Sequence, residues 1–180
     1  MVDDGLQVKK SWVDLKGRVI MKIPIVISKD FTFDCAHMLS KHSGDCASLH
    51  GHTYRLSVKV TGYLTEDKGS SSEGMVIDYG TLSSIVKQVV ISKFDHAFIY
   101  DVGCSLSCTI SELLKARNLR VLELPCRSTA ENLCIYIATL IRKSLPKGIK
   151  LVEVVIWETP NSSATYSEEV DINKSCSKGE

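Results

Sequence analysis

The sequence of 180 residues predicts a single domain of the α+β class. Two observations support this prediction. Residues 23–64 contain long stretches in which apolar and polar side chains alternate with a period of two, whereas later segments repeat apolar residues at helical spacing. We expect two long strands, three helices and a final buried strand. One folded unit should span residues 23–167, between an N-terminal extension (1–22) and a polar C-terminal tail (168–180).

The two long strands are predicted at residues 23–37 and 50–64. In the first, Phe31, Phe33, Cys35 and His37 share one face. In the second, both histidines of the HGH sequence share a face with apolar side chains such as Leu56, Val58 and Val60. The histidines therefore belong to the apolar face of each strand.

The remaining elements follow in order along the chain. MVID (75–78) reads as a short strand, and TLSSIVKQVVISKF (81–94) as a helix with Asp78 near its start. SCTISELLKAR (107–117) predicts a short helix, which leads into a strand at RVLEL (120–124). The segment 128–145 predicts a third helix that opens with a capping box of Ser128 and Glu131. LVEVVIW (151–157) is a buried strand that ends at Glu158.

Composition excludes several classes of protein. Lys and Arg (22) nearly balance Asp and Glu (21), so no basic field indicates a nucleic-acid partner. No stretch approaches the roughly 18 apolar residues of a membrane span, and the acidic opening MVDDGLQVKK is not a secretory signal. The seven cysteines form an odd set without a CxxC pair, which is typical of a reducing compartment. We therefore expect a cytoplasmic protein without a membrane partner.

Three histidines form a candidate metal site. His50 and His52 point to the same side of one strand, and His37 lies on the matching face of the preceding strand. A lone histidine on an apolar face is more often a core residue, but three on convergent faces favour a metal. Catalytic zinc sites supply three protein ligands and leave a fourth position open, and no cysteine here has the spacing of a closed zinc finger.

Three further positions are candidates for chemistry. Cys46 lies in a polar loop four residues before His50, where a nearby metal would favour its thiolate, although a small buried residue is the alternative. In the pair Asp95-His96, the carboxylate could orient the imidazole as an acid or base. Glu158 either binds a cationic or NH-rich ligand or is a solvated strand end.

Six ordered blocks carry a resemblance that covers residues 28–166. They read FDCAH, C-x3-HGHTY, GMVIDYGTL, FDHAFI, STAENL and a final ETP. Together they resemble the 6-pyruvoyl-tetrahydropterin synthase and 6-carboxytetrahydropterin synthase family. The resemblance implies the tunnelling fold, in which a four-stranded antiparallel sheet carries helices on one face and subunits close into an oligomeric barrel. It also implies a hexamer made of two trimers, with sites at subunit interfaces.

The same resemblance implies residue roles. Zn²⁺ would be held by His37, His50 and His52 and would act on 7,8-dihydroneopterin triphosphate as a Lewis acid. Cys46 would accept a proton from the substrate side chain, and His96, oriented by Asp95, would be a second acid or base. Glu158 would anchor the NH edge of the pterin. Three residues, Ser128, Thr129 and Glu131, match a segment near the pterin pocket.

The position of the cysteine favours one branch of the family. The carboxy-forming enzymes carry it four residues before the first histidine of HGH, as here, whereas the pyruvoyl-forming enzymes typically carry it six before. A third branch has a glutamate where this chain has Ala47. The resemblance thus implies a 6-carboxytetrahydropterin synthase of the queuosine route. The alternatives are a 6-pyruvoyl-tetrahydropterin synthase and a non-catalytic member that binds a pterin or purine. The chain lacks the HExxH sequence of a common class of zinc hydrolase.

Overall fold

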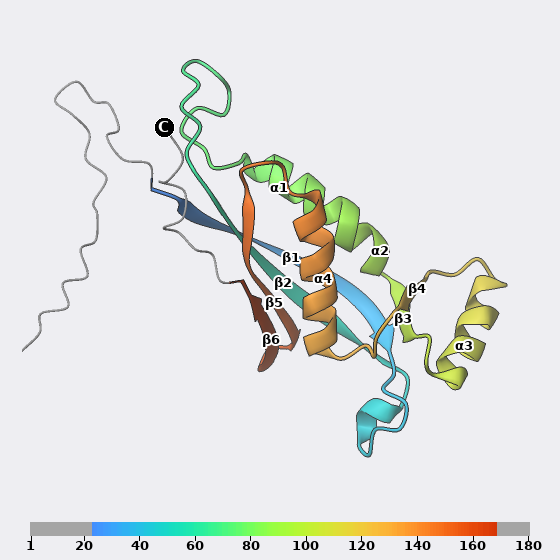
Figure 1. The fold of residues 1–180 in the computed structure, drawn as a ribbon. Helices are drawn as coiled ribbons and strands as arrows, with labels where there is room; N and C mark the ends of the chain where they lie inside the picture. The colour runs from blue at the N-terminus through green and yellow to red at the C-terminus, as the bar shows by residue number, and fades with distance from the viewer. Residues whose placement is uncertain (1–22, 169–180) are drawn as a thin grey trace, which may run out of the picture.

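Six strands form one sheet in the order β4-β3-β1-β2-β5-β6, in a computed structural model that describes residues 23–168 (Figure 1). Their bounds are β1 Ile25–His37, β2 His50–Gly62, β3 Ala97–Asp101, β4 Val121–Leu124, β5 Lys150–Thr159 and β6 Ser162–Ser167. The predicted extension (1–22) and all but the first residue of the predicted tail (168–180) lie outside the described residues. The α+β class is confirmed.

The sheet is larger than predicted, and it is mixed. Four of the strands form the expected antiparallel core, in which β1 pairs with β2, β2 with β5, and β5 with β6. β3 and β4 extend it with parallel pairing, β3 to β1 and β4 to β3. The prediction of a four-stranded antiparallel sheet was therefore wrong. β3 was missed because its five residues follow a helix after only two residues, and β6 because it is a short edge strand in which most side chains are polar.

Helices cover the apolar face of the antiparallel strands. Along this face run α1 Tyr79–Val86, a π-helical turn η2 Lys87–Ile91, α2 Ser92–Phe94 and, beside them, α4 Ala130–Ser144 (Figure 1). Asp78 caps α1 by accepting a hydrogen bond from the backbone N–H of Thr81 at 2.9 Å. MVID, predicted as a strand, is instead an irregular segment that ends with this cap, and Val76 within it is buried.

The core lies between these helices and the sheet. Its largest fully buried side chains include Phe33, Tyr54, Leu56, Leu82, Leu133, Ile137 and Ile156. The rings of Phe33 on β1 and Tyr54 on β2 stack with centroids 5.3 Å apart. Tyr54 thus continues the core toward the end of the sheet that carries the histidines, and it places a rigid wall beside them.

One helix, α3 Ser105–Lys115, packs on the opposite face of the sheet, so the prediction that the helices share one face was wrong. Ile99 of β3 belongs to the main core, whereas its neighbours Phe98 and Tyr100 point the other way. There Lys115 of α3 donates to the Tyr100 hydroxyl at 3.0 Å, and that hydroxyl donates to Glu123 of β4 at 2.9 Å. This network anchors α3 under the added strands.

The start of α4 also differs from the prediction. Thr129, in extended conformation, is the N-cap, and its hydroxyl accepts from the backbone N–H of Asn132 at 3.4 Å. The predicted capping box of Ser128 and Glu131 was therefore wrong by one residue. Because the helix begins after Thr129, the backbone carbonyl of Ser128 is free to point toward β1.

Among residues 23–168, no helix is long and apolar enough to cross a membrane.

Candidate active site

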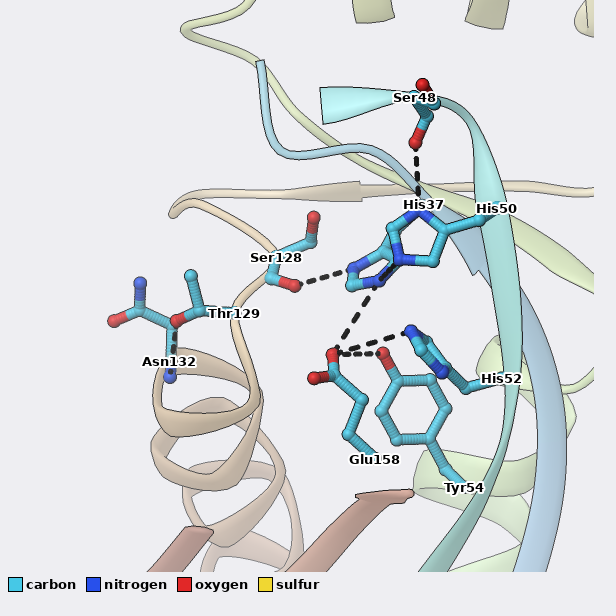
Figure 2. A network of polar contacts seen from close by, with 9 residues as sticks. All are labelled: His37, Ser48, His50, His52, Tyr54, Ser128, Thr129, Asn132 and Glu158. Carbon is cyan, nitrogen blue, oxygen red and sulfur yellow. Dashed lines mark hydrogen bonds and ion pairs between the residues drawn. The ribbon is translucent and has the colours of Figure 1, made fainter. Parts of the chain in front are cut away.

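The three histidines predicted from strand alternation lie together at one end of the sheet. β1 ends and β2 begins there, and the antiparallel register pairs His37 directly with His50. His52 lies two residues further along β2 and on the same face. One ring nitrogen from each of the three lies within 4.8 Å of the others, which is the size of a site for one metal ion (Figure 2).

Hydrogen bonds to backbone carbonyls fix two of these rings. His37 Nδ1 lies 2.8 Å from the carbonyl oxygen of Ser128, and His50 Nδ1 lies 2.8 Å from that of Ser48 (Figure 2). A carbonyl can only accept, so each Nδ1 carries the hydrogen and each Nε2 presents its lone pair. Backbone carbonyls in this position are a common outer support of metal-ligating histidines.

The Nε2 atoms of the three histidines lie close together. The Nε2 atoms of His37 and His50 are 3.1 Å apart. His52 Nε2 is buried and has no hydrogen-bond partner within the described chain. Buried nitrogen atoms are rarely left unpaired. A divalent metal among the three would satisfy all of them, so the residues present fit the metal that the resemblance implies.

Burial keeps two of these imidazoles, those of His37 and His52, in the form that binds metal. Desolvation lowers the pKa of His37, against the opposing effect of its hydrogen bond to Ser128. Desolvation also lowers the pKa of His52, although the nearby carboxylate of Glu158 acts in the opposite direction. Neutral imidazole is the ligating form, so both shifts favour a metal over a proton.

Glu158 lies beside the trio. It is the extra residue of a bulge near the end of β5, where Trp157 and Thr159 pair with consecutive residues of β6. Its Oε1 atom is 3.6 Å from His37 Nε2 and 3.8 Å from His52 Nε2, and it accepts a hydrogen bond from the Tyr54 hydroxyl at 3.2 Å (Figure 2). The carboxylate that was predicted at a strand end is therefore part of the site.

Cys46 lies in a short helical turn, η1 Asp45–Ala47, in the loop between β1 and β2. The loop is closed by a hydrogen bond from the backbone N–H of Leu39 to the Cys46 carbonyl at 2.8 Å. The thiol is half-buried. Burial raises the pKa of Tyr54, and the charges of Cys35, Glu158 and Cys46 add to this effect.

Asp95 and His96 form a pair, and the pair faces the other side of the sheet. His96 Nδ1 lies 3.0 Å from Asp95 Oδ1, and the imidazole is 72% exposed. With Asp34 and Thr53, which alternate with the inward-facing residues of β1 and β2, His96 lines a cavity of about 820 Å³. His52 also borders this cavity, whereas His37 and His50 do not line it.

Backbone contacts hold this pair in place. Asp95 Oδ1 accepts from the backbone N–H of Asp34 at 3.0 Å, and the backbone N–H of His96 donates to the Asp34 carbonyl at 2.6 Å. The Asp34 contact is the main cause that lowers the pKa of Asp95. His96 has a φ of 59°, a left-handed conformation that is uncommon for a histidine and often marks a functional position.

The predicted pterin-pocket residues divide into two groups. Ser128 contributes its carbonyl to His37, and its buried hydroxyl has no partner among the residues described. Thr129 caps α4, and Glu131 is exposed in the first turn of that helix.

No role was predicted from the sequence for Tyr54, whose hydroxyl contacts Glu158. The available signal was its position two residues after His52 on the same face.

Comparisons with known proteins agree with this geometry. The sequence model of the family described as "6-pyruvoyl tetrahydropterin synthase" matches residues 26–169. A Haemophilus influenzae protein named 6-carboxy-5,6,7,8-tetrahydropterin synthase is 40% identical, over 79% of this chain and 98% of its own length. A Synechocystis protein of the same name is 32% identical, over 78% and 92%.

A solved structure is similar as well. The 6-pyruvoyl tetrahydropterin synthase of Caenorhabditis elegans superposes with a TM-score of 0.58 at 25% identity, covering 83% of this chain and 99% of that one. The family match, the identity to the H. influenzae protein and the clustered histidines lead to one conclusion: the chain belongs to the 6-pyruvoyl tetrahydropterin synthase family.

Proposed function

We propose that this protein is a zinc-dependent 6-carboxy-5,6,7,8-tetrahydropterin synthase of the cytoplasm. It would convert 7,8-dihydroneopterin triphosphate and one water to 6-carboxytetrahydropterin, acetaldehyde and triphosphate, an early step toward 7-deazaguanines such as queuosine. The observation that carries the proposal is the convergence of three imidazoles beside Glu158, with Cys46 four residues before His50. The names of the H. influenzae and Synechocystis relatives support the same branch.

His37, His50 and His52 hold the metal in this proposal. When bound, zinc supplies Lewis-acid stabilisation of charge that develops on the substrate side-chain oxygens. Ser128 and Ser48 fix the imidazole tautomers through their carbonyls.

The other residues bind substrate and move protons. Glu158 presents a carboxylate that matches two adjacent N–H donors on a pterin edge. Cys46 accepts the proton from the side-chain carbon, and its polar loop leaves the thiol accessible. Ser128, Thr129 and Glu131 flank the pterin, at the start of α4.

His96, oriented by Asp95, is the second acid or base, and we infer that it serves the metal site of another subunit. Within one chain His96 lines a cavity that neither His37 nor His50 lines, which is consistent with a site completed by an oligomer. The sheet edges are consistent with assembly: within the described chain, β1 pairs with β3 only at Cys35 and Ala36, and β6 has no strand on its outer side. A hexamer of two trimers is the expected form.

Product analysis tests the function. Purified, zinc-loaded protein is incubated with 7,8-dihydroneopterin triphosphate, and the products are separated by mass spectrometry while acetaldehyde is trapped as a hydrazone. Equal amounts of carboxypterin and acetaldehyde are expected. Pyruvoyltetrahydropterin without acetaldehyde would instead identify the second candidate, a 6-pyruvoyl synthase, which the C. elegans structure favours.

The variant Cys46→Ala separates an enzyme from a binding protein. An enzyme should lose turnover while it keeps its metal and its affinity for pterin. A wild-type protein that binds neopterin but yields neither product would identify the third candidate, a non-catalytic pterin-binding member of the fold.

A further inference from the structure

Three contacts in the site converge on one oxygen of Glu158. Oε1 accepts from the Tyr54 hydroxyl at 3.2 Å and lies 3.6 and 3.8 Å from the Nε2 atoms of His37 and His52. The other carboxylate oxygen points away from the histidines (Figure 2). Both distances to nitrogen exceed hydrogen-bond length, so the hydroxyl of Tyr54 is the closest of the three partners of Oε1.

The distances place Oε1 close to the fourth corner of a metal site. Around a tetrahedral zinc ion with ligands at about 2.0–2.1 Å, neighbouring ligand atoms lie roughly 3.3 Å apart. The separations between Oε1 and the two nitrogens are only slightly larger than this. A small movement of the side chain would make Glu158 a fourth ligand, and the metal would then have no open position for substrate.

The position of the Tyr54 hydroxyl is fixed by the core. The ring is completely buried, stacks on Phe33 and contacts the His52 ring edge-on with centroids 5.5 Å apart. A phenol in this position can donate to Oε1 but cannot follow the carboxylate toward the metal. Donation also lowers the electron density of the oxygen, which makes it a weaker metal ligand.

We propose that Tyr54 is a positioning residue that keeps Glu158 off the metal. By holding Oε1 outside the coordination shell, it leaves the fourth position open and leaves the second oxygen available for a ligand with N–H donors. The inference rests on the proposed function for the identity of that ligand, but the choice between an open and a closed metal site follows from the Tyr54-Glu158 contact alone.

Cobalt-substituted protein tests the proposal without turnover. The metal-free protein is loaded with Co²⁺, its visible absorption is recorded, and azide is titrated as a small anion that fills an open position. In the wild-type protein azide should shift the spectrum. In Tyr54→Phe the carboxylate should coordinate, so the azide response should weaken by at least about tenfold and Co²⁺ should bind about tenfold more tightly, as measured against a competing chelator.

Two further variants isolate the contact. Tyr100→Phe is the matched control, because Tyr100 is also buried and its hydroxyl also donates to a glutamate, Glu123, away from the metal. It should leave both cobalt measurements at wild-type values. In Glu158→Gln the carboxamide is a poor ligand, so adding Tyr54→Phe to this variant should have no further effect on azide binding.

The outcomes are distinguishable. The proposal is wrong if Tyr54→Phe binds azide like the wild type, or if it binds Co²⁺ more weakly, which would mean that Tyr54 supports a coordinated Glu158. It is also wrong if Tyr54→Phe has the same effect in the Glu158→Gln background. If wild-type protein binds no Co²⁺ at all, the metal site and with it the proposed function fail first.

Neopterin affinity, measured by fluorescence quenching, should fall about tenfold in Tyr54→Phe through the loss of Glu158 as an anchor.

Discussion

His37 and His50 face each other across β1 and β2 with their Nε2 atoms 3.1 Å apart, while the Nδ1 of each contacts a backbone carbonyl. Two nitrogens that both present lone pairs repel at this distance. A metal cation bound by both nitrogens would remove this repulsion. This relationship makes the end of the sheet a site whose stability depends on its occupant.

Metal removal should therefore lower stability. We expect one Zn²⁺ per chain by elemental analysis and a free energy of unfolding that increases by about 2.7 kcal/mol at a free zinc concentration of 100 Kd. His50→Gln should abolish both the stoichiometric metal and this increase. Retention of one tightly bound zinc by His50→Gln would contradict the assignment of the three ligands.

The metal-free protein should lose stability as the pH falls below about 6.5, the pKa of histidine in an unfolded chain. Burial lowers the pKa of His37 and His52 in the folded state. Between the lowered pKa and 6.5 the unfolded chain binds more protons, so falling pH favours unfolding; above this window the effect vanishes. Urea titrations of chelator-treated protein at pH 7.5 and 5.5 measure the difference. His37→Gln should lose less stability than the wild type, and an equal loss would contradict the prediction.

The long strands could be predicted because one face of each is buried, and a period of two then appears in the sequence. The phenylalanines of β1 and the branched residues of β2 carry this pattern without interruption. β3 carries no such pattern, because all but its last residue are buried. β6 carries only a weak one, because Ala164 and Tyr166 are partly buried between exposed polar residues and no residue of the strand is fully buried. The face that α3 covers depends on the parallel β3-β4 crossover, which no local pattern reveals.

Gly51 should be required between the two histidines because of its neighbours. A Cβ atom at this position would lie 3.1 Å from the Cys35 carbonyl oxygen and 3.6 Å from the Ala36 Cα, both backbone atoms of β1. Gly51→Ala must therefore spread β1 and β2 at the metal site. We expect a loss of about 1–3 kcal/mol in the free energy of unfolding by urea titration and weaker Zn²⁺ binding.

A second substitution checks the cause of this loss. Ala36→Gly removes the side chain opposite Gly51 but leaves both contacting backbone atoms in place. It should not rescue Gly51→Ala. Rescue would show that side-chain crowding, and not the backbone approach, is responsible.

The candidate site divides in the same way between predictable and unpredictable parts. His37, His50 and His52 were found from strand alternation, and Glu158 from its position at a strand end. The side of the sheet that His96 faces depends on its left-handed backbone and on its bond to Asp34. Those contacts join residues that are about sixty positions apart, and no local pattern encodes them. The same holds for Tyr54 and Glu158, which meet only because β2 pairs with β5.

The cysteines should differ sharply in reactivity. Burial raises the pKa of Cys134 to about 11 and also raises that of Cys35, and the Cys134 thiol donates to the Val154 carbonyl at 3.1 Å. Cys46 is half-buried in a polar loop. Because the thiolate is the reactive form, iodoacetamide at pH 7.5 should label Cys46 at least about ten times faster than Cys134 or Cys35.

Peptide mass spectrometry over a time course measures each rate separately. The same chain in urea should label at all three positions at similar rates, which shows that the fold is the cause of the difference. Zn²⁺ together with neopterin should slow the labelling of Cys46 and leave the two buried cysteines unchanged. Equal labelling of Cys46 and Cys134 in the native protein would contradict an accessible Cys46 thiol and remove the structural basis for Cys46 as the proton acceptor.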